Sequence, residues 1–198
     1  MPTKPKSSAN EIYQIKVTLL GTDIWRRLLV PSDLTLARLH DVLQIAMGWE
    51  DDHLHAFRAG QQVYGPPSRQ GYAFNIDDRI DEGEVQLHQL LARVGSKIVY
   101  TYDFGDGWEH GIVLEKRLPV DQDMTYPVCT GGENAGPPED IGGVGGYYDL
   151  VEAIQDPQHE RHEEFLEWVG EEWDPGVFPI EKVNGTLQRI RRRAAGSQ

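Results

Sequence analysis

Cysteine is nearly absent from this 198-residue chain, which contains one, and long apolar runs are missing altogether. A single cysteine excludes an internal disulfide framework and any zinc site built from several thiolates. No window approaches the roughly 18 consecutive apolar residues that a membrane-spanning helix needs. Residues 1–10 also lack the apolar stretch of a secretory signal. We therefore expect a cytoplasmic protein that has no membrane partner.

Positive charge is scarce and unevenly distributed along the chain, whose formal net charge is −13. Residues 103–181 carry 3 basic and 20 acidic side chains, whereas residues 182–198 carry 5 basic and no acidic ones. An acidic block of this size repels phosphate backbones, so we expect no nucleic-acid binding except through the short basic tail. The alternative is that the acidic block is simply solvated surface.

The hydropathy pattern predicts one α+β domain: a β-grasp-like mixed sheet with a core helix, a late β-hairpin and carboxyl-terminal helices. Strands are indicated by alternating apolar residues, and helices by apolar residues at helical spacing. The strands are expected over residues 12–20, 24–30, 53–59, 61–64, 97–104 and 108–117, and the helices over 36–47, 87–94, 147–155, 160–169 and 180–192.

Three segments are expected to lie outside regular structure. Residues 1–10 are polar and predict a disordered arm before a single domain over 11–192, and residues 193–198 form a basic tail. Residues 66–84 are polar and irregular. Residues 119–146 contain 7 glycines and 4 prolines, so we expect no regular element there.

Several segments together resemble the plasmid pRiA4b ORF-3-like family: IWRRLLVP (24–31), LTLARLHDVLQIAMGW (34–49), HLHAF (53–57), YDFGDGWEH (102–110), PPEDIGG (137–143) and FLEWVGEEWDP (165–175). The resemblance implies an α+β fold and a plasmid- or insertion-element-borne protein of unestablished activity, best described as a binding or accessory protein. That family often carries a second cysteine where this chain has Gly136, so a cysteine pair is not expected here.

The predicted hairpin over 98–114 carries the first candidate site. If its loop is Gly105-Asp106-Gly107, the apolar and aromatic residues and His110 share one face. Asp103 then lies opposite Glu109, with Asp106 at the tip. Like charges in that position destabilise, so a shared proton, a cation or an arginine must compensate. We expect either a coupled carboxylate pair in a pocket or neutralisation by Arg26, Arg27 or Arg58.

His53 and His55 form the second candidate site. Residues two apart on a strand point the same way, so both imidazoles can reach one metal ion. The third ligand would be Asp103, Asp106, Glu109 or Cys129. This arrangement predicts, as the alternative function, a metal-dependent hydrolase. The competing interpretation packs one histidine in the core and exposes the other. We expect no cofactor, a divalent metal being the one open possibility.

Cys129 and the Pro-Pro-Glu-Asp stretch complete the candidate residues. Two prolines can hold Glu139 and Asp140 rigidly, whereas the acidic surroundings favour Cys129 as a small buried residue over a reactive thiolate. The candidate pocket therefore comprises Asp103, Asp106, Glu109, His110, Cys129, Glu139 and Asp140. Its ligand or protein partner is not identified by the sequence.

The last predicted helix has an apolar stripe, formed by Val183, Leu187 and Ile190. We expect this basic segment to dock on the acidic helices of its own chain, over residues 160–174, and not on nucleic acid. Exposed ion pairs contribute only about 0–1 kcal/mol each, so the apolar stripe should supply most of the docking free energy.

Overall fold

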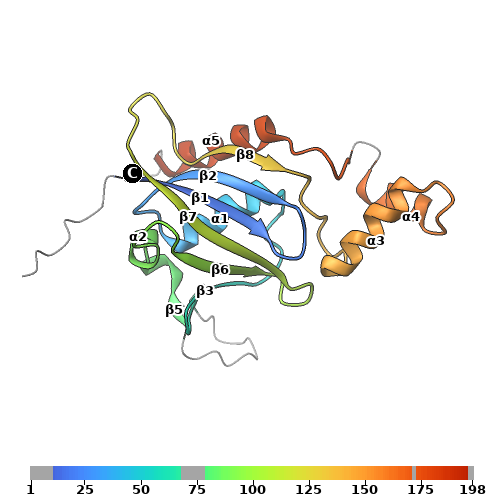
Figure 1. Ribbon diagram of the computed structural model, residues 1–198, viewed down its shortest axis with the longest axis horizontal. Coiled ribbons are helices and arrows are strands. Elements are labelled where there is room, and N and C mark those ends of the chain that lie inside the picture. Colours follow the sequence, from blue (N-terminus) through green and yellow to red (C-terminus); the bar gives the residue numbers. More distant parts are fainter. Residues whose placement is uncertain (1–10, 68–78, 171–172, 196–198) are drawn as a thin grey trace, which may run out of the picture.

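A sheet of eight strands, in the order β5-β4-β3-β6-β7-β1-β2-β8, organises the described residues of the computed structural model (Figure 1). These are residues 11–67, 79–170 and 173–195, the last five in backbone only. Neighbouring strands are antiparallel except for the parallel pair β4–β5. The strands are β1 Glu11–Leu19, β2 Trp25–Pro31, β3 His55–Ala59, β4 Gln62–Gly65, β5 Ile80–Asp81, β6 Lys97–Tyr102, β7 Trp108–Pro119 and β8 Val128–Glu133.

The helices are α1 Leu36–Met47, α2 Leu87–Leu90, α3 Gly143–Gln155, α4 His162–Val169 and α5 Ile180–Ala195, with a 3₁₀ turn η1 at Glu82–Glu84. The central helix α1 begins after Thr35, whose hydroxyl accepts the Arg38 N–H, and ends at Gly48 with φ 89°. Both are standard helix caps. Within the described residues, no helix combines the length and the apolar character needed to cross a bilayer.

One face of the sheet is covered and the other faces solvent. Along β1, Ile15, Val17 and Leu19 are fully buried, and they belong to the same core as the apolar face of α1, which lies behind the sheet in Figure 1. The residues between them point to the opposite face of the sheet. On that face, Arg27 of β2 forms an ion pair with Glu115 of β7, with Nε and Oε2 2.7 Å apart. Because side chains alternate between the two faces of a strand, one face of the sheet is apolar and buried and the other is charged and exposed.

The structure confirms the α+β class, the first hairpin and the core helix. The β-grasp-like arrangement remains a prediction. The expected arm over 1–10 lies outside the described residues, and α5 continues through Ala195, beyond the predicted domain end at residue 192.

The predicted register of the late hairpin is wrong. Tyr102 lies opposite Trp108, so five residues form the turn instead of three, and Glu109 faces Thr101 instead of Asp103. Moving the register by two residues leaves the same side chains on the buried face, so the apolar pattern fitted both versions equally well. Only Phe104 changes, becoming 49% exposed in the turn. The coupled Asp103–Glu109 pair therefore does not form.

The glycine-rich segment 119–146 contains regular structure after all. It includes the edge strand β8 and the first turn of α3. Several of its glycines are sites of close approach: a Cβ on Gly132 would lie 2.5 Å from the Phe178 ring, and one on Gly131 would contact Trp25 at 3.6 Å. Glycine in a strand can mark such an approach instead of a break, which the composition alone did not reveal.

The expected neighbours of the last helix are also wrong. Val183 and Leu187 are buried, as predicted, but α5 packs against β8 and α1 instead of the acidic helices. The Asn184 amide exchanges two hydrogen bonds, of 2.8 and 2.9 Å, with the Cys129 backbone. Among the side chains that the structure describes, which in α5 end at residue 190, no ion pair joins α5 to α4. The helix and the acidic pair α3–α4 lie apart in Figure 1.

Candidate functional site

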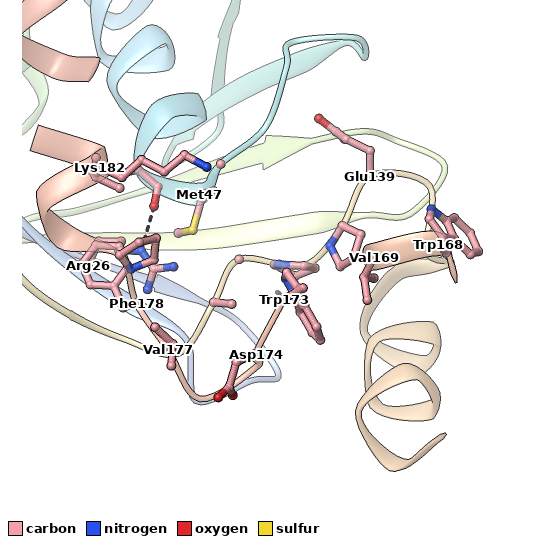
Figure 2. A pocket seen from close by; sticks show the side chains of 18 of the residues that line it. Arg26, Met47, Glu139, Trp168, Val169, Trp173, Asp174, Val177, Phe178 and Lys182 are labelled. Atoms are coloured by element: carbon pink, nitrogen blue, oxygen red, sulfur yellow. Dashed lines mark hydrogen bonds between the residues drawn. The ribbon is translucent and has the colours of Figure 1, made fainter. Parts of the chain in front are cut away.

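A cavity of about 650 Å³ lies between the carboxyl end of α1, the segment 135–140, the end of α4 and the residues leading into α5. Its walls combine apolar and aromatic side chains with a few charged groups, which is typical of small-molecule sites. Figure 2 shows Arg26, Lys182 and Phe178 gathered at one end, and Glu139 with Trp168 at the other. The cavity therefore has a basic end and an acidic end.

Arg26 forms the floor of the basic end. It occupies an inward-facing position of β2 and is 1% exposed. Its Nε donates to the Ala46 carbonyl at 2.8 Å, and Nη1 donates to those of Trp25 and Glu133. The Phe178 ring covers the guanidinium, with its centroid 3.9 Å from Cζ. Burial lowers the pKa of Arg26 to about 10, so it stays charged at neutral pH.

Glu139 anchors the acidic end. Its Oε1 accepts hydrogen bonds from the Glu50 N–H and the Tyr102 hydroxyl, both at 3.1 Å. Desolvation raises the pKa of this carboxyl above its ordinary value. The Trp49 indole fixes the chain two residues earlier by donating to the Pro137 carbonyl at 2.9 Å. The segment 137–140 is thus held firmly against the loop that follows α1.

His53 lies behind this segment, among three carboxylates. Its Nε2 is 3.2 Å from Asp140 Oδ1, 3.8 Å from Asp103 Oδ2 and 3.9 Å from Glu139 Oε2. Of the described residues' buried polar atoms, His53 Nε2 and Glu139 Oε2 are two that have no hydrogen-bond partner. Ligand atoms about 2.1 Å from a tetrahedral ion are separated by about 3.4 Å, so this spacing suits a divalent cation. One ligand atom each from His53, Asp103 and Asp140 lies within 4.8 Å of the others.

Backbone conformation aims the two aspartates at His53. Asp103 and Asp140 have φ values of 51° and 57°, a region that few non-glycine residues adopt. Asp103 Oδ1 accepts the Gly105 N–H at 2.8 Å, which leaves Oδ2 to face the imidazole. The five-residue turn after β6 is therefore what delivers Asp103 to the cluster.

His55 belongs to a different cluster. Its Nε2 lies 2.9 Å from a carboxylate oxygen of Glu82, and its ring stacks on that of His40 with centroids 3.6 Å apart. The nitrogens of His40 contact the Tyr100 hydroxyl and Asp51 Oδ1, both at 2.8 Å. Desolvation and the neighbouring His55 lower the pKa of His40.

This second cluster also brings possible metal ligands together, namely His40, Asp51 and His55. Stacked imidazoles direct their lone pairs along parallel planes, however, and both His40 nitrogens already have hydrogen-bonding partners. The arrangement is that of a buried polar network which holds the loop after α1. The structure thus places the two predicted histidine ligands, His53 and His55, in separate clusters.

The other predicted site residues lie apart from His53. Asp106 Oδ2 accepts the Gly142 N–H at 3.0 Å, just before α3. Glu109 points outward, 3.9 Å from Arg58. His110 is buried in the core, where burial lowers its pKa to about 4. Cys129 is buried in β8, and desolvation raises the pKa of its thiol, consistent with a packed side chain.

The basic end of the cavity is not among the sites that the sequence predicts. The sequence predicts Arg26 as a partner for Asp103 and Glu109, whereas in the structure it is buried on the opposite face of the sheet from Glu109. The usable signal was its position in β2: it alternates in phase with Ile24 and Leu28, both fully buried. A charged residue on the apolar face of a strand is an exception that calls for a partner or a ligand. Trp173, Phe178 and Lys182 lie more than 140 residues further along the chain and carried no such signal.

Comparison with known proteins places the chain among uncharacterised relatives. Residues 11–182 match the family model described as plasmid pRiA4b ORF-3-like protein. The chain is 39% identical over 188 residues to the uncharacterized protein y4hQ of Sinorhizobium fredii, covering 93% of this chain and 94% of the relative. It is also similar to the crystal structure of MM3350, a protein of unknown function from Methanosarcina mazei Go1. That match has a TM-score of 0.77 and 35% identity, and covers 87% of this chain and 97% of the other.

Proposed function

Since the chain belongs to the plasmid pRiA4b ORF-3-like family, we propose that it is a mobile-element-associated binding or accessory protein that holds a divalent cation. The ligands are His53, Asp103 and Asp140, with Glu139 beside them. One observation carries the proposal: a buried imidazole nitrogen and a buried carboxylate oxygen face each other at 3.9 Å, and neither has a hydrogen-bond partner among the described residues. Such atoms are costly to leave unsatisfied, and a cation satisfies both.

The ligand set favours zinc or manganese. An imidazole is a good ligand for zinc, whereas carboxylates suit harder ions such as manganese and magnesium. A mixed set of one nitrogen and two or three oxygens lies between these preferences. The ion would tie together three separate segments, around residues 53, 103 and 140. Because residues 139 and 140 also line the cavity, the ion would fix one wall of that cavity.

A metal-dependent hydrolase is the second candidate function. The favouring observation is that the Asp140 side chain is 70% exposed, which leaves one side of the cluster open to water. A catalytic metal needs such an open position, where the bound water loses a proton near neutral pH. His55 is hydrogen-bonded to Glu82. The proposed hydrolase therefore uses His53 with Asp103, Glu139 and Asp140 instead of both predicted histidines.

Titration calorimetry of chelator-treated protein with zinc and with manganese tests the proposal. We expect one equivalent to bind, and His53→Ala and Asp140→Asn to weaken binding at least tenfold, because each removes a ligand. His159→Ala, on the loop between α3 and α4, is the matched control. Failure of both metals to bind, or equal binding by His53→Ala, would overturn the proposal.

The same metal-loaded protein separates the two functions. Turnover of p-nitrophenyl ester or phosphodiester substrates that disappears in His53→Ala would favour the hydrolase. Stoichiometric metal without turnover would favour the binding protein.

A further inference from the structure

The basic end of the cavity contains a buried cation, Arg26, that has no counter-charge among the described residues. In the described part of the chain, no carboxylate lies within 4.0 Å of the Arg26 guanidinium. It donates three hydrogen bonds, all from Nε and Nη1 to backbone carbonyls, whereas Nη2 has no partner among the described residues. Buried charges in proteins are normally paired, because an uncompensated one is expensive to remove from water. Among the described residues, Arg26 therefore lacks the anionic partner that its burial demands.

The neighbouring side chains extend this basic end towards the cavity. Lys182, from the first turn of α5, lines the same cavity and lies on the same side as Arg26 in Figure 2. Asp174 also lines the cavity, but Figure 2 shows its carboxylate directed away from the guanidinium. A planar guanidinium beside a lysine is suited to bind a carboxylate or a phosphate group.

The rest of the cavity is suited to an apolar body. Trp168 and Trp173 line it, and Trp168 is 48% exposed. An exposed tryptophan at the mouth of a cavity offers a flat apolar surface to a ligand. The volume of about 650 Å³ falls within the range of small-molecule sites, which is roughly 300–1,000 Å³.

We propose that this cavity binds a small organic anion, with its carboxylate or phosphate head on Arg26 and Lys182 and its apolar or aromatic body against Trp168 and Trp173. The head supplies the counter-charge that Arg26 lacks, and the tryptophans remove the body from water. The two residues that bind the head, Arg26 and Lys182, are not ligands of the cation cluster, whose Glu139 and Asp140 line the opposite end of the same cavity. Anion binding can therefore be tested with a chelator present.

Calorimetry with four small probes in a chelating buffer tests the proposal. The probes 3-phenylpropionate and phenyl phosphate carry the two anionic heads, 3-phenylpropionamide is the neutral analogue, and 3-phenylpropylamine carries the opposite charge. We expect at least one anionic probe to bind about tenfold or more tightly than the amide, and the amine to bind most weakly. Comparing the two anions identifies which head the site prefers.

Variants show whether the preference comes from the residues named. Lys182→Ala should reduce the preference for the anion over the amide several-fold. Arg26→Lys should reduce it further, because a lysine keeps the positive charge but lacks the paired N–H donors of the guanidinium. Trp173→Leu should weaken the binding of the anionic probe and of the amide by similar factors. Lys116→Ala, on the outer face of the sheet, is the control. Circular dichroism of each variant checks that it is folded.

Three results would overturn the proposal: an amide that binds as tightly as both anions, an anion preference unchanged in Lys182→Ala and in folded Arg26→Lys, or no binding of either anion up to about 10 mM. Because the chelator removes divalent cations throughout, failure of the cation proposal would leave these outcomes unaffected.

Discussion

Replacing His110 by phenylalanine should flatten the dependence of stability on pH. This imidazole has no exposed surface and lies 5.3 Å, centroid to centroid, from both Trp49 and Tyr100. Its Nδ1 donates towards the Trp108 and Tyr100 carbonyls, at 3.1 and 3.3 Å. Its Nε2 has no partner in the described residues. A proton added there would place an unpaired charge among aromatic rings, so burial lowers the pKa to about 4.

The size of the effect follows from that pKa. In the unfolded chain the imidazole titrates near 6.5, so the unfolded state takes up its proton first as the pH falls. The contribution of this imidazole to the free energy of unfolding is therefore fully present above pH 6.5 and is lost progressively as the pH falls to about 4. A shift of one pKa unit corresponds to about 1.4 kcal/mol, so the shift from 6.5 to about 4 should cost about 3 kcal/mol of unfolding free energy.

Urea unfolding at several pH values between 7 and 4 measures this loss. The phenylalanine variant should start less stable at pH 7, since two hydrogen bonds are missing, but its stability should fall by about 3 kcal/mol less than that of the wild type on acidification. Acidic groups and the other histidines contribute equally to both proteins and cancel in the difference. His159→Gln, outside the core, should keep the wild-type slope. A constant gap between wild type and His110→Phe across the pH range would refute the reasoning.

Two further substitutions test packing, one beside the cavity and one beneath α5. A Cβ on Gly136 would overlap the Met47 carbonyl, whereas one on Gly145 would meet nothing within 4 Å; we expect Gly136→Ala to lower the free energy of unfolding by about 1–3 kcal/mol and Gly145→Ala to leave it nearly unchanged or raise it. Equal stabilities in denaturant titrations would contradict this. Leu187→Ala should cost about 2–5 kcal/mol, because Leu187 is fully buried where α5 meets the core. The exposed Leu20, at 42%, is its control, and a similarly small effect at both positions would show that α5 does not stabilise the domain.

Part of the candidate site follows from local sequence and part does not. The motifs at residues 53–55, 102–110 and 137–140 stand apart in the sequence, and the structure brings one residue or two from each to the His53 cluster. The grouping within them was not predictable. His53 and His55 are two residues apart, yet the strand begins at His55, so the alternation argument did not apply to His53.

The sequence by itself determined which residues would be buried in the regular elements. The alternation along β1, β6 and β7 and the helical spacing of α1 indicate which side chains face the core and which face water. This preference depends on the side chain itself and is the same whichever strand lies alongside. Composition likewise determined that one cysteine could not form a disulfide within the chain. These properties are local, because they depend on side-chain chemistry and on the period of the backbone.

Only the tertiary structure decided register, neighbours and ion pairing. Two registers of the late hairpin bury the same side chains, so the turn that places Asp103 beside His53 is set by contacts with residues around 53 and 140. Likewise, Arg26 meets Phe178 only because α5 and the segment before it fold back over β8. Contacts between residues so far apart in the chain depend on how whole elements pack, and the local pattern of either residue contains no information about the other.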